Sequence, residues 1–138
     1  MRRQFNLPEQ DVTFLEGLGL PWEAIIDRGM QWVLVYDYPL PLGYTHPTVT
    51  VAIKIETGYP RAALDMAYFL PHIERADGKG INAISAQQID NKLFQRWSRH
   101  RTAANPWREG LDDLSTHLGL VTNWFEEEFK KHANGIAA

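Results

Sequence analysis

Four polar side chains in the second half of the chain have types that can do chemistry. Ser98 and His100 stand two residues apart in the segment Gln95–His100, and His72 and Asn82 precede them. A serine hydroxyl acts as a nucleophile when a histidine accepts its proton. No Gly-x-Ser-x-Gly turn frames Ser98, however, and a spacing of two residues does not force a hydrogen bond. The pattern favours a structural role, in which Ser98 shapes a turn and His100 holds a loop.

The histidines do not form a metal-binding pattern. They stand at positions 46, 72, 100, 117 and 132, without a His-x-x-x-His or His-Glu-x-x-His motif. His72, His100 and Asp90 could meet in space, but their spacing does not require it. His117 follows Leu114 by three residues on the apolar side of a predicted helix, where a buried histidine is the simpler interpretation. We therefore predict no metal site and no bound cofactor.

A basic and aromatic stretch between residues 92 and 108 is the most distinctive part of the chain. Similar interleaving occurs in proteins that bind single-stranded nucleic acid. The chain has 14 basic and 17 acidic residues, however, and its net charge of −3 disfavours such a partner. We predict instead a protein-binding surface or loop anchors at Arg96, Trp97, Arg99, Trp107 and Arg108.

One physical arrangement would explain the first part of this stretch. Trp97 would fill the gap between a sheet and the last helix. Arg96 and Arg99 would bond loop carbonyls, and His100 would fix the loop against the strand that ends at Leu70. A segment held in this way is rigid, as a binding surface requires.

The elements that must position these side chains begin and end with helices. Pro8 followed by Glu9 is typical of a helix start, and Gly17 marks the end of this first helix. Residues 20–26 predict a further short helical turn. From Gly110 onward, leucine and aromatic residues recur at helical spacing, which predicts a long amphipathic helix.

The middle of the chain predicts an antiparallel sheet. Strand patterns occupy three ranges with short breaks: 31–38, 48–56 and 64–70. Residues 72–107 then show little regular pattern beyond a brief extended piece at 81–84, and a run of that length is usually functional. The order of helix, strands, irregular segment and helix predicts an α+β fold.

The composition suits one globular domain. A chain of 138 residues corresponds to a single domain, and 44% apolar with 22% charged residues is ordinary. No apolar run approaches the ~18 residues of a membrane span, and none follows Arg2 and Arg3 as a secretion signal would require. The chain has no cysteine, which excludes disulfides, thiolate ligands and a cysteine nucleophile within it. We predict a cytoplasmic protein.

Four short motifs resemble the ubiquitin-conjugating-enzyme fold. That fold carries Tyr-Pro after a hairpin, then His-Pro-Asn-Ile, then Gly-x-Ile-Cys, and Trp-x-Pro-x-Leu before the next helix. The corresponding segments here are Tyr59-Pro60, Leu70-Pro71-His72-Ile73, Asp77-Gly78-Lys79-Gly80-Ile81-Asn82 and Trp107-Arg108-Glu109-Gly110-Leu111.

Longer strings are similar to a bacterial branch of that superfamily, the prokaryotic ubiquitin-conjugating-enzyme-like family, over about residues 7–129. They are Leu7-Pro8 with Asp11 to Leu15, Leu20–Ile25, Gly58–Pro60 with Leu64–Met66, Gln95–His100, and Trp107–Gly110 with Leu114–Leu118. The resemblance implies one domain over residues 1–138, with its core at about 7–132. It also implies an operon with a ubiquitin-like or multi-ubiquitin-like protein, a ThiF-like activating enzyme and a JAB-type or related peptidase. Antiviral defence is a further implication of such operons.

The chain departs from this family pattern at the catalytic cysteine. Asn82 or Ala83 stands where the superfamily carries it, and an asparagine amide cannot accept a thioester. His72 replaces the asparagine that stabilises the oxyanion in true conjugating enzymes. A histidine can donate the same hydrogen bond, but without a nucleophile it has no oxyanion to stabilise.

Three functions remain open at this point. The first is a non-catalytic partner that binds the ubiquitin-like protein, its activating enzyme or the peptidase. The second is an enzyme of ubiquitin-like conjugation or processing that uses a non-cysteine site around His72, Ser98 and His100. The third is an RWD-like protein-interaction module unrelated to ubiquitin.

Overall fold

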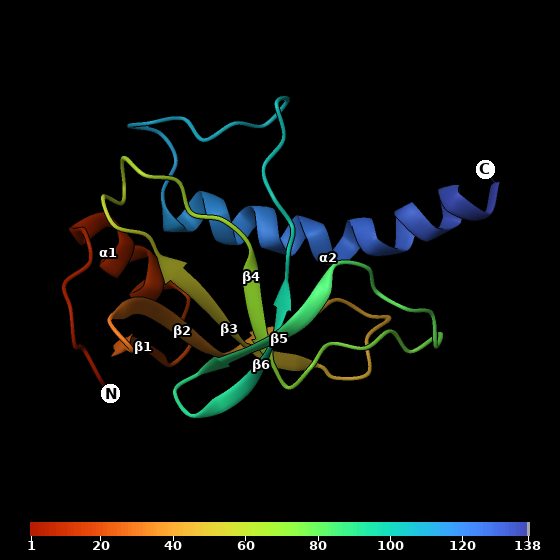
Figure 1. Ribbon diagram of the computed structural model, residues 1–138, viewed down its shortest axis with the longest axis horizontal. Helices are drawn as coiled ribbons and strands as arrows, with labels where there is room; N and C mark the ends of the chain where they lie inside the picture. Colours follow the sequence, from red (N-terminus) through yellow and green to blue (C-terminus); the bar gives the residue numbers. More distant parts are fainter. Residues whose placement is uncertain (138) are drawn as a thin grey trace.

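The computed structural model describes residues 1–137 of the chain and the side chains of residues 1–130. The elements are α1 (Glu9–Gly17), β1 (Trp22–Asp27), β2 (Met30–Pro39), β3 (Thr48–Ile55), β4 (Ala67–Leu70), β5 (Ile84–Ile89), β6 (Lys92–Trp97) and α2 (Leu114–Ala137). The strands form one antiparallel sheet in the order β1-β2-β3-β4-β6-β5. The predicted α+β fold is confirmed: α2 crosses one face of the sheet, and α1 lies beside the start of α2 (Figure 1).

Neither helix is long and apolar enough, within the part of the chain that the structure describes, to cross a membrane.

The apolar core fills both faces of the sheet. On the face toward α2, Val51 and Ile53 of β3 are fully buried together with Leu118 and Phe125 of the helix. On the other face the β5–β6 hairpin covers a second cluster, whose buried members are Ile25, Trp32, Leu34, Ala52, Tyr68, Ile89 and Phe94. The alternating pattern of β3 predicts one buried face, but buried Ala52 shows that the second face is covered as well.

Two hairpins of the sheet close with the same kind of turn. Arg28 and Gly29 link β1 to β2 with φ angles of 51° and 78°, and Asp90 and Asn91 link β5 to β6 with 54° and 61°. Positive φ at both turn residues is the signature of the type I′ turn. In such a hairpin the residues beside the turn bond to each other, so every second residue directs its backbone away from the partner strand. These outward positions are 22, 24 and 26 in β1, and 84, 86 and 88 in β5.

The predicted helical turn at residues 20–26 is wrong, because this segment forms β1. Trp22, Glu23, Ala24 and Ile25 are all buried, so the run has neither the period of a surface helix nor that of a half-exposed strand. Pairing with β2 at six successive positions decides the conformation.

The predicted irregular segment 72–107 is also wrong in part, because it contains the β5–β6 hairpin. The turn at Asp90 and Asn91 has two residues that tolerate positive φ but lacks the glycine of the usual two-residue turn, and β5 is mostly polar, so the hairpin signal is weak. The strand expected over 64–70 is shorter and begins at Ala67. Met66, just before it, has a φ of 58°, which interrupts the extended backbone.

Helix α2 begins at Leu114, a turn later than Gly110. Asp113 lies just before the helix, and its Oδ1 accepts the N–H groups of Ser115 and Thr116 at 3.0 and 3.2 Å. A carboxylate in this position satisfies amides that have no partner inside the helix.

Tyr59, in the loop after β3, connects the two helices. Its hydroxyl accepts the Leu114 N–H at 2.7 Å and donates to Asp11 Oδ2 of α1 at 2.6 Å. Burial raises the pKa of the Tyr59 hydroxyl, so it stays protonated and keeps its role as a donor.

Candidate functional site

Three of the four predicted chemical side chains meet at one hollow beside α2. The hollow measures about 560 Å³ and is lined by Asn82, Ala83, Ser98, Arg99, His100, Thr102, Trp124, Glu127 and Lys130. We call it the α2 hollow. The Ser98 N–H donates to the Ala83 carbonyl at 2.9 Å, which holds the two loop segments side by side. The structure therefore brings Asn82, Ser98 and His100 into one neighbourhood.

His72 does not line the α2 hollow. Its Nε2 lies 3.1 Å from the Leu93 carbonyl oxygen of β6, and its side chain lines a separate hollow of about 330 Å³. Leu93 lies in the part of β6 that does not pair with β4, so the His72 ring contacts a carbonyl outside that ladder. The oxyanion role that the resemblance implies for His72 has no support in this placement.

His100 is oriented by a carboxylate. Its Nδ1 lies 2.7 Å from Asp65 Oδ2, and the two side chains are 57% and 40% exposed. The contact lies within the range 64–70 that was expected to form this strand, two residues before β4 begins. An imidazole held by a carboxylate is the base half of a hydrolytic site. Among the described residues, however, no hydrogen bond joins the Ser98 hydroxyl to His100.

The residues considered for a metal site are held apart. Asp90 accepts from the Arg2 guanidinium at 2.7 and 2.8 Å, while His72 contacts Leu93 and His100 contacts Asp65. Within the described part of the chain, no three histidine, aspartate or glutamate side chains gather as metal ligands do.

Trp97 lies between the sheet and α2. It is fully buried, and its ring packs against Phe69 of β4 and Phe125 of α2 at centroid distances of 5.1 and 5.8 Å. Buried Gln95, on the same face of β6, bonds both the N–H and the C=O of Ile73 with its side-chain amide at 2.8 and 3.1 Å. The side chains of β6 thus fix the loop after β4 as well as the helix.

Among the residues whose side chains the structure describes, neither Arg96 nor Arg99 bonds a loop carbonyl, contrary to the sequence prediction. The Arg96 guanidinium lies 3.7 Å from the Met66 sulfur, and Arg99 donates to Glu128 Oε1 at 2.5 Å. The prediction is wrong because α2 brings a carboxylate within reach of Arg99. The stacking of Arg99 over the Trp97 ring, at 4.2 Å, places its guanidinium there.

A buried charge cluster below the α2 hollow was not predicted. Glu128 of α2 is 2% exposed and pairs with both Arg99 and Arg75, and Arg75 also donates to the Glu128 carbonyl at 3.0 Å. Arg75 further pairs with Asp77 and holds the pKa of that carboxyl at about 2. Sequence spacing contains no signal for this cluster, because Arg75 and Glu128 are 53 residues apart and meet only through the fold.

Trp107 and Arg108 anchor the loop that leads into α2. The Trp107 indole N–H donates to the Pro60 carbonyl at 3.1 Å, and Arg101 stacks over its ring at 4.8 Å. Arg108 pairs with buried Asp112 and lowers the pKa of that carboxyl to about 2. Neither Trp107 nor Arg108 lines the α2 hollow.

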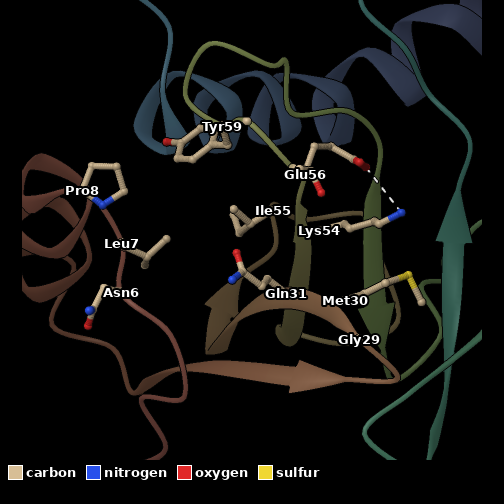
Figure 2. Close-up of a pocket in the computed structure, with 12 residues that line it drawn as sticks. Asn6, Leu7, Pro8, Gly29, Met30, Gln31, Lys54, Ile55, Glu56 and Tyr59 are labelled. Atoms are coloured by element: carbon tan, nitrogen blue, oxygen red, sulfur yellow. Dashed lines mark ion pairs between the residues drawn. The ribbon is translucent and has the colours of Figure 1, made fainter.

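Figure 2 shows another hollow, of about 420 Å³, on the side of the molecule where the N-terminal segment passes β2 and β3. Asn6, Leu7 and Pro8 line one wall, and the ion pair between Lys54 and Glu56 (3.6 Å) lies across from them. Its lining contains no histidine, so it lacks the acid–base group present at the α2 hollow.

Comparison with known protein families gives a match over most of the chain. The model of a family described as prokaryotic E2 family E matches residues 7–128. This range contains the α2 hollow apart from Lys130, the hollow of Figure 2 apart from Asn6, and every site residue predicted from the sequence. Neither the curated proteins nor the solved structures yield a match.

Proposed function

Because the chain belongs to prokaryotic E2 family E, with the ubiquitin-conjugating fold, we propose that it is a non-catalytic partner in a ubiquitin-like modification system. It binds the ubiquitin-like protein, its activating enzyme or the peptidase without becoming covalently charged. The observation that carries this proposal is the absence of cysteine from all 138 residues. A thioester forms only on a thiolate, so the conclusion holds whichever position aligns with the family's cysteine.

The side chains at the α2 hollow support binding better than chemistry. Asn82 and Ala83 are exposed but offer no nucleophile, and the Ser98 hydroxyl has no base within hydrogen-bond distance among the described residues. A serine without a hydrogen-bonded base is a weak nucleophile at neutral pH.

Buried residues next to the α2 hollow hold its lining in place. Trp97 is fully buried, and Arg99 is fixed by the carboxylate of Glu128. Exposed Thr102 and Lys130 form part of the rim. A preorganised surface loses little conformational entropy when a partner docks, which favours binding.

Purified proteins of the same operon test this proposal directly. The chain is mixed with the activating enzyme, ATP and the ubiquitin-like protein, and intact mass is measured with and without a reducing agent. We expect no covalent adduct on this chain but saturable binding of at least one partner by calorimetry. Thr102→Trp, which fills the α2 hollow, should weaken that binding at least ~10-fold.

Thr57→Trp is the matched control, because Thr57 is an equally exposed threonine that lines the hollow of Figure 2. It should leave the affinity unchanged. An adduct on this chain would contradict the proposal. Failure of all three proteins to bind would favour an interaction module unrelated to ubiquitin.

A second function is favoured by one observation, the contact of 2.7 Å between His100 and Asp65. In this alternative, His100 is the general base of an enzyme that conjugates or processes a ubiquitin-like substrate. His100→Ala should then abolish turnover of that substrate while leaving the melting temperature nearly unchanged. No turnover by the unaltered chain, or a large loss of stability in the variant, would remove this alternative.

A further inference from the structure

Residues 78–83, which precede β5, lie between two hollows, and we call this segment the strap. Its first four residues line the hollow of about 330 Å³ that His72 also lines. Its last two residues, Asn82 and Ala83, line the α2 hollow. The strap is therefore a partition between the two hollows.

One buried carboxylate connects the two hollows. Arg75 lines the smaller hollow and Arg99 lines the α2 hollow. Both guanidinium groups pair with the carboxylate of Glu128, at 3.5 and 2.5 Å, and Glu128 is buried. The two hollows are thus neighbours, and a displaced strap would join them into one groove.

Few contacts hold the strap in place. Among the described residues, 80–82 form no hydrogen bond, and the bonds of residues 78 and 79 stay within the range 75–79. The Ala83 carbonyl accepts one bond, from the Ser98 N–H at 2.9 Å. Ile81 is half-buried and packs against the core, whereas the other strap residues are exposed. A segment with so few hydrogen bonds and buried contacts opens at low cost.

Ala83 has a backbone conformation that its side chain disfavours. Its φ is 60°, and at such an angle the Cβ approaches the following carbonyl oxygen. Arg28, Asp90 and Asn91 also have positive φ, but they close the type I′ turns, which require it. A strained residue persists when its surroundings determine it fully, and Ala83 is exposed and held by one hydrogen bond. A conformation with negative φ is therefore close in free energy.

We propose that the strap is a gate that moves between the described position and a second one, in which Ala83 has a negative φ and the two hollows form one groove. β5 stays paired with β6 in both positions, so a change of φ at Ala83 turns the residues before it, and Ile81 leaves the core. The gate sets whether the α2 hollow ends at Asn82 or continues into the smaller hollow. The inference concerns the free chain, so it stands whether or not the proposed function does.

Distances between two spin labels test this proposal on the full chain, because the chain has no cysteine of its own. One label is attached to Asn82→Cys in the strap and the other to Lys92→Cys, an exposed position of β6. Pulsed electron paramagnetic resonance should show two distance populations for this pair. A second pair, Ile26→Cys with Lys92→Cys, joins two exposed positions of the sheet and should show one.

Substitutions of Ala83 should shift the ratio of the two populations. Ala83→Val adds a branched side chain that disfavours positive φ more strongly, so it should raise the second population. Ala83→Gly and Ala83→Asn tolerate positive φ and should lower it. The ratio should differ at least ~5-fold between Ala83→Val and Ala83→Gly.

Ala86→Val is the matched control, because Ala86 is equally exposed but lies in the extended backbone of β5. It should leave the ratio unchanged. Ala83→Gly and Ala83→Asn relieve strain, so the test does not depend on whether Ala83→Val folds. A single distance population in every variant, a ratio that does not respond to Ala83, or an equal response to Ala86→Val would overturn the proposal.

Discussion

The two edges of the sheet have the same hairpin geometry but differ in what covers them. At β1, the Arg2 carbonyl accepts the Ala24 N–H at 3.0 Å, the Gln4 N–H donates to the Ala24 carbonyl at 2.7 Å, and Gln4 Oε1 accepts the Ile26 N–H at 2.7 Å. Each bond falls on an outward position of β1. No segment of the described chain does this for β5.

Ion pairs reinforce the covered edge. Arg2 pairs with Glu23 of β1 and with Asp90 in the β5–β6 turn, at 2.9 and 2.7 Å. The guanidinium holds the pKa of Glu23 well below its usual range. The comparison teaches that exposure of an edge depends on whether the chain supplies a cover, since the strand geometry is the same at both ends of the sheet.

Trp97→Ala should have the largest effect, because this side chain fixes the hairpin that carries the open edge. Removing a fully buried indole should lower the free energy of unfolding by ~3–5 kcal/mol, measured by urea denaturation. Hydrogen exchange should accelerate more in β5 and β6 than in β1 and β2. A nearly neutral result would contradict the buried role of Trp97.

Arg2→Ala should open the covered edge at a smaller cost. It removes the guanidinium from the buried Glu23 carboxylate, which keeps the Tyr36 hydroxyl and the backbone N–H of residue 2 as donors, and losing hydrogen bonds to a charged group costs about 1–3 kcal/mol. The Ala24 amide should then exchange faster. Arg61→Ala is the control, since its ion pair with Glu109 is largely exposed and should contribute less than ~1 kcal/mol. Equal losses of unfolding free energy in the two variants would show that the Arg2 ion pairs stabilise the chain no more than an exposed ion pair does.

A pH series on His117→Gln should change stability without changing the difference between the edges. His117 is fully buried, and its Nε2 lies 2.8 Å from the carbonyl oxygen of Met66, next to the central strand β4. Burial lowers its pKa below 6.5, so the unfolded chain binds more protons as the pH falls through 6.5.

The His117 contribution is therefore present above pH 6.5 and lost below it, by at most ~1.4 kcal/mol per pH unit. Urea denaturation between pH 7.5 and 5.5 should show a flatter profile for His117→Gln than for the unaltered chain. Parallel profiles would show that His117 is not the group responsible.

Ala86→Lys should have the smallest effect on stability, within ~0.5 kcal/mol, because the side chain is exposed. The outward amides of β5, at residues 84, 86 and 88, should still exchange rapidly in this variant when measured by NMR, because no described segment covers them. Ile26→Lys introduces the same charge at an outward, exposed position of the covered edge, and the residue 26 amide should stay protected by Gln4 Oε1. Equally rapid exchange of the outward amides at both edges would contradict the difference between them.

The sequence predicted the elements with a clear period and missed those without one. The alternation in 48–56 locates β3, and the apolar spacing from Gly110 onward locates α2, which begins at Leu114. β1 was missed because short buried runs are ambiguous, and the β5–β6 hairpin was missed because β5 is mostly polar and the turn at Asp90 and Asn91 lacks a glycine. The fold class was predictable because the segments that resemble the family lie along the whole matched range, residues 7–128.

At the candidate site, the sequence named side chains that lie close together in the fold, but it did not indicate their contacts. Asn82, Ser98 and His100 do line one hollow. The pairing of Arg99 with Glu128 could not be read from spacing, because it depends on which face α2 turns toward the sheet. Likewise, the unpaired state of β5 depends on sheet order, which is a property of the whole chain.

The bonds of Tyr59 to both helices have a consequence for folding. The first amide of α2 is satisfied by a hydroxyl 55 residues away, and that hydroxyl is held by Asp11 of α1. α2 therefore cannot complete its own N-terminal end by local contacts alone, and the two helix ends form one cooperative unit. Opening of α1 should expose the Leu114 amide, although the two lie in separate elements.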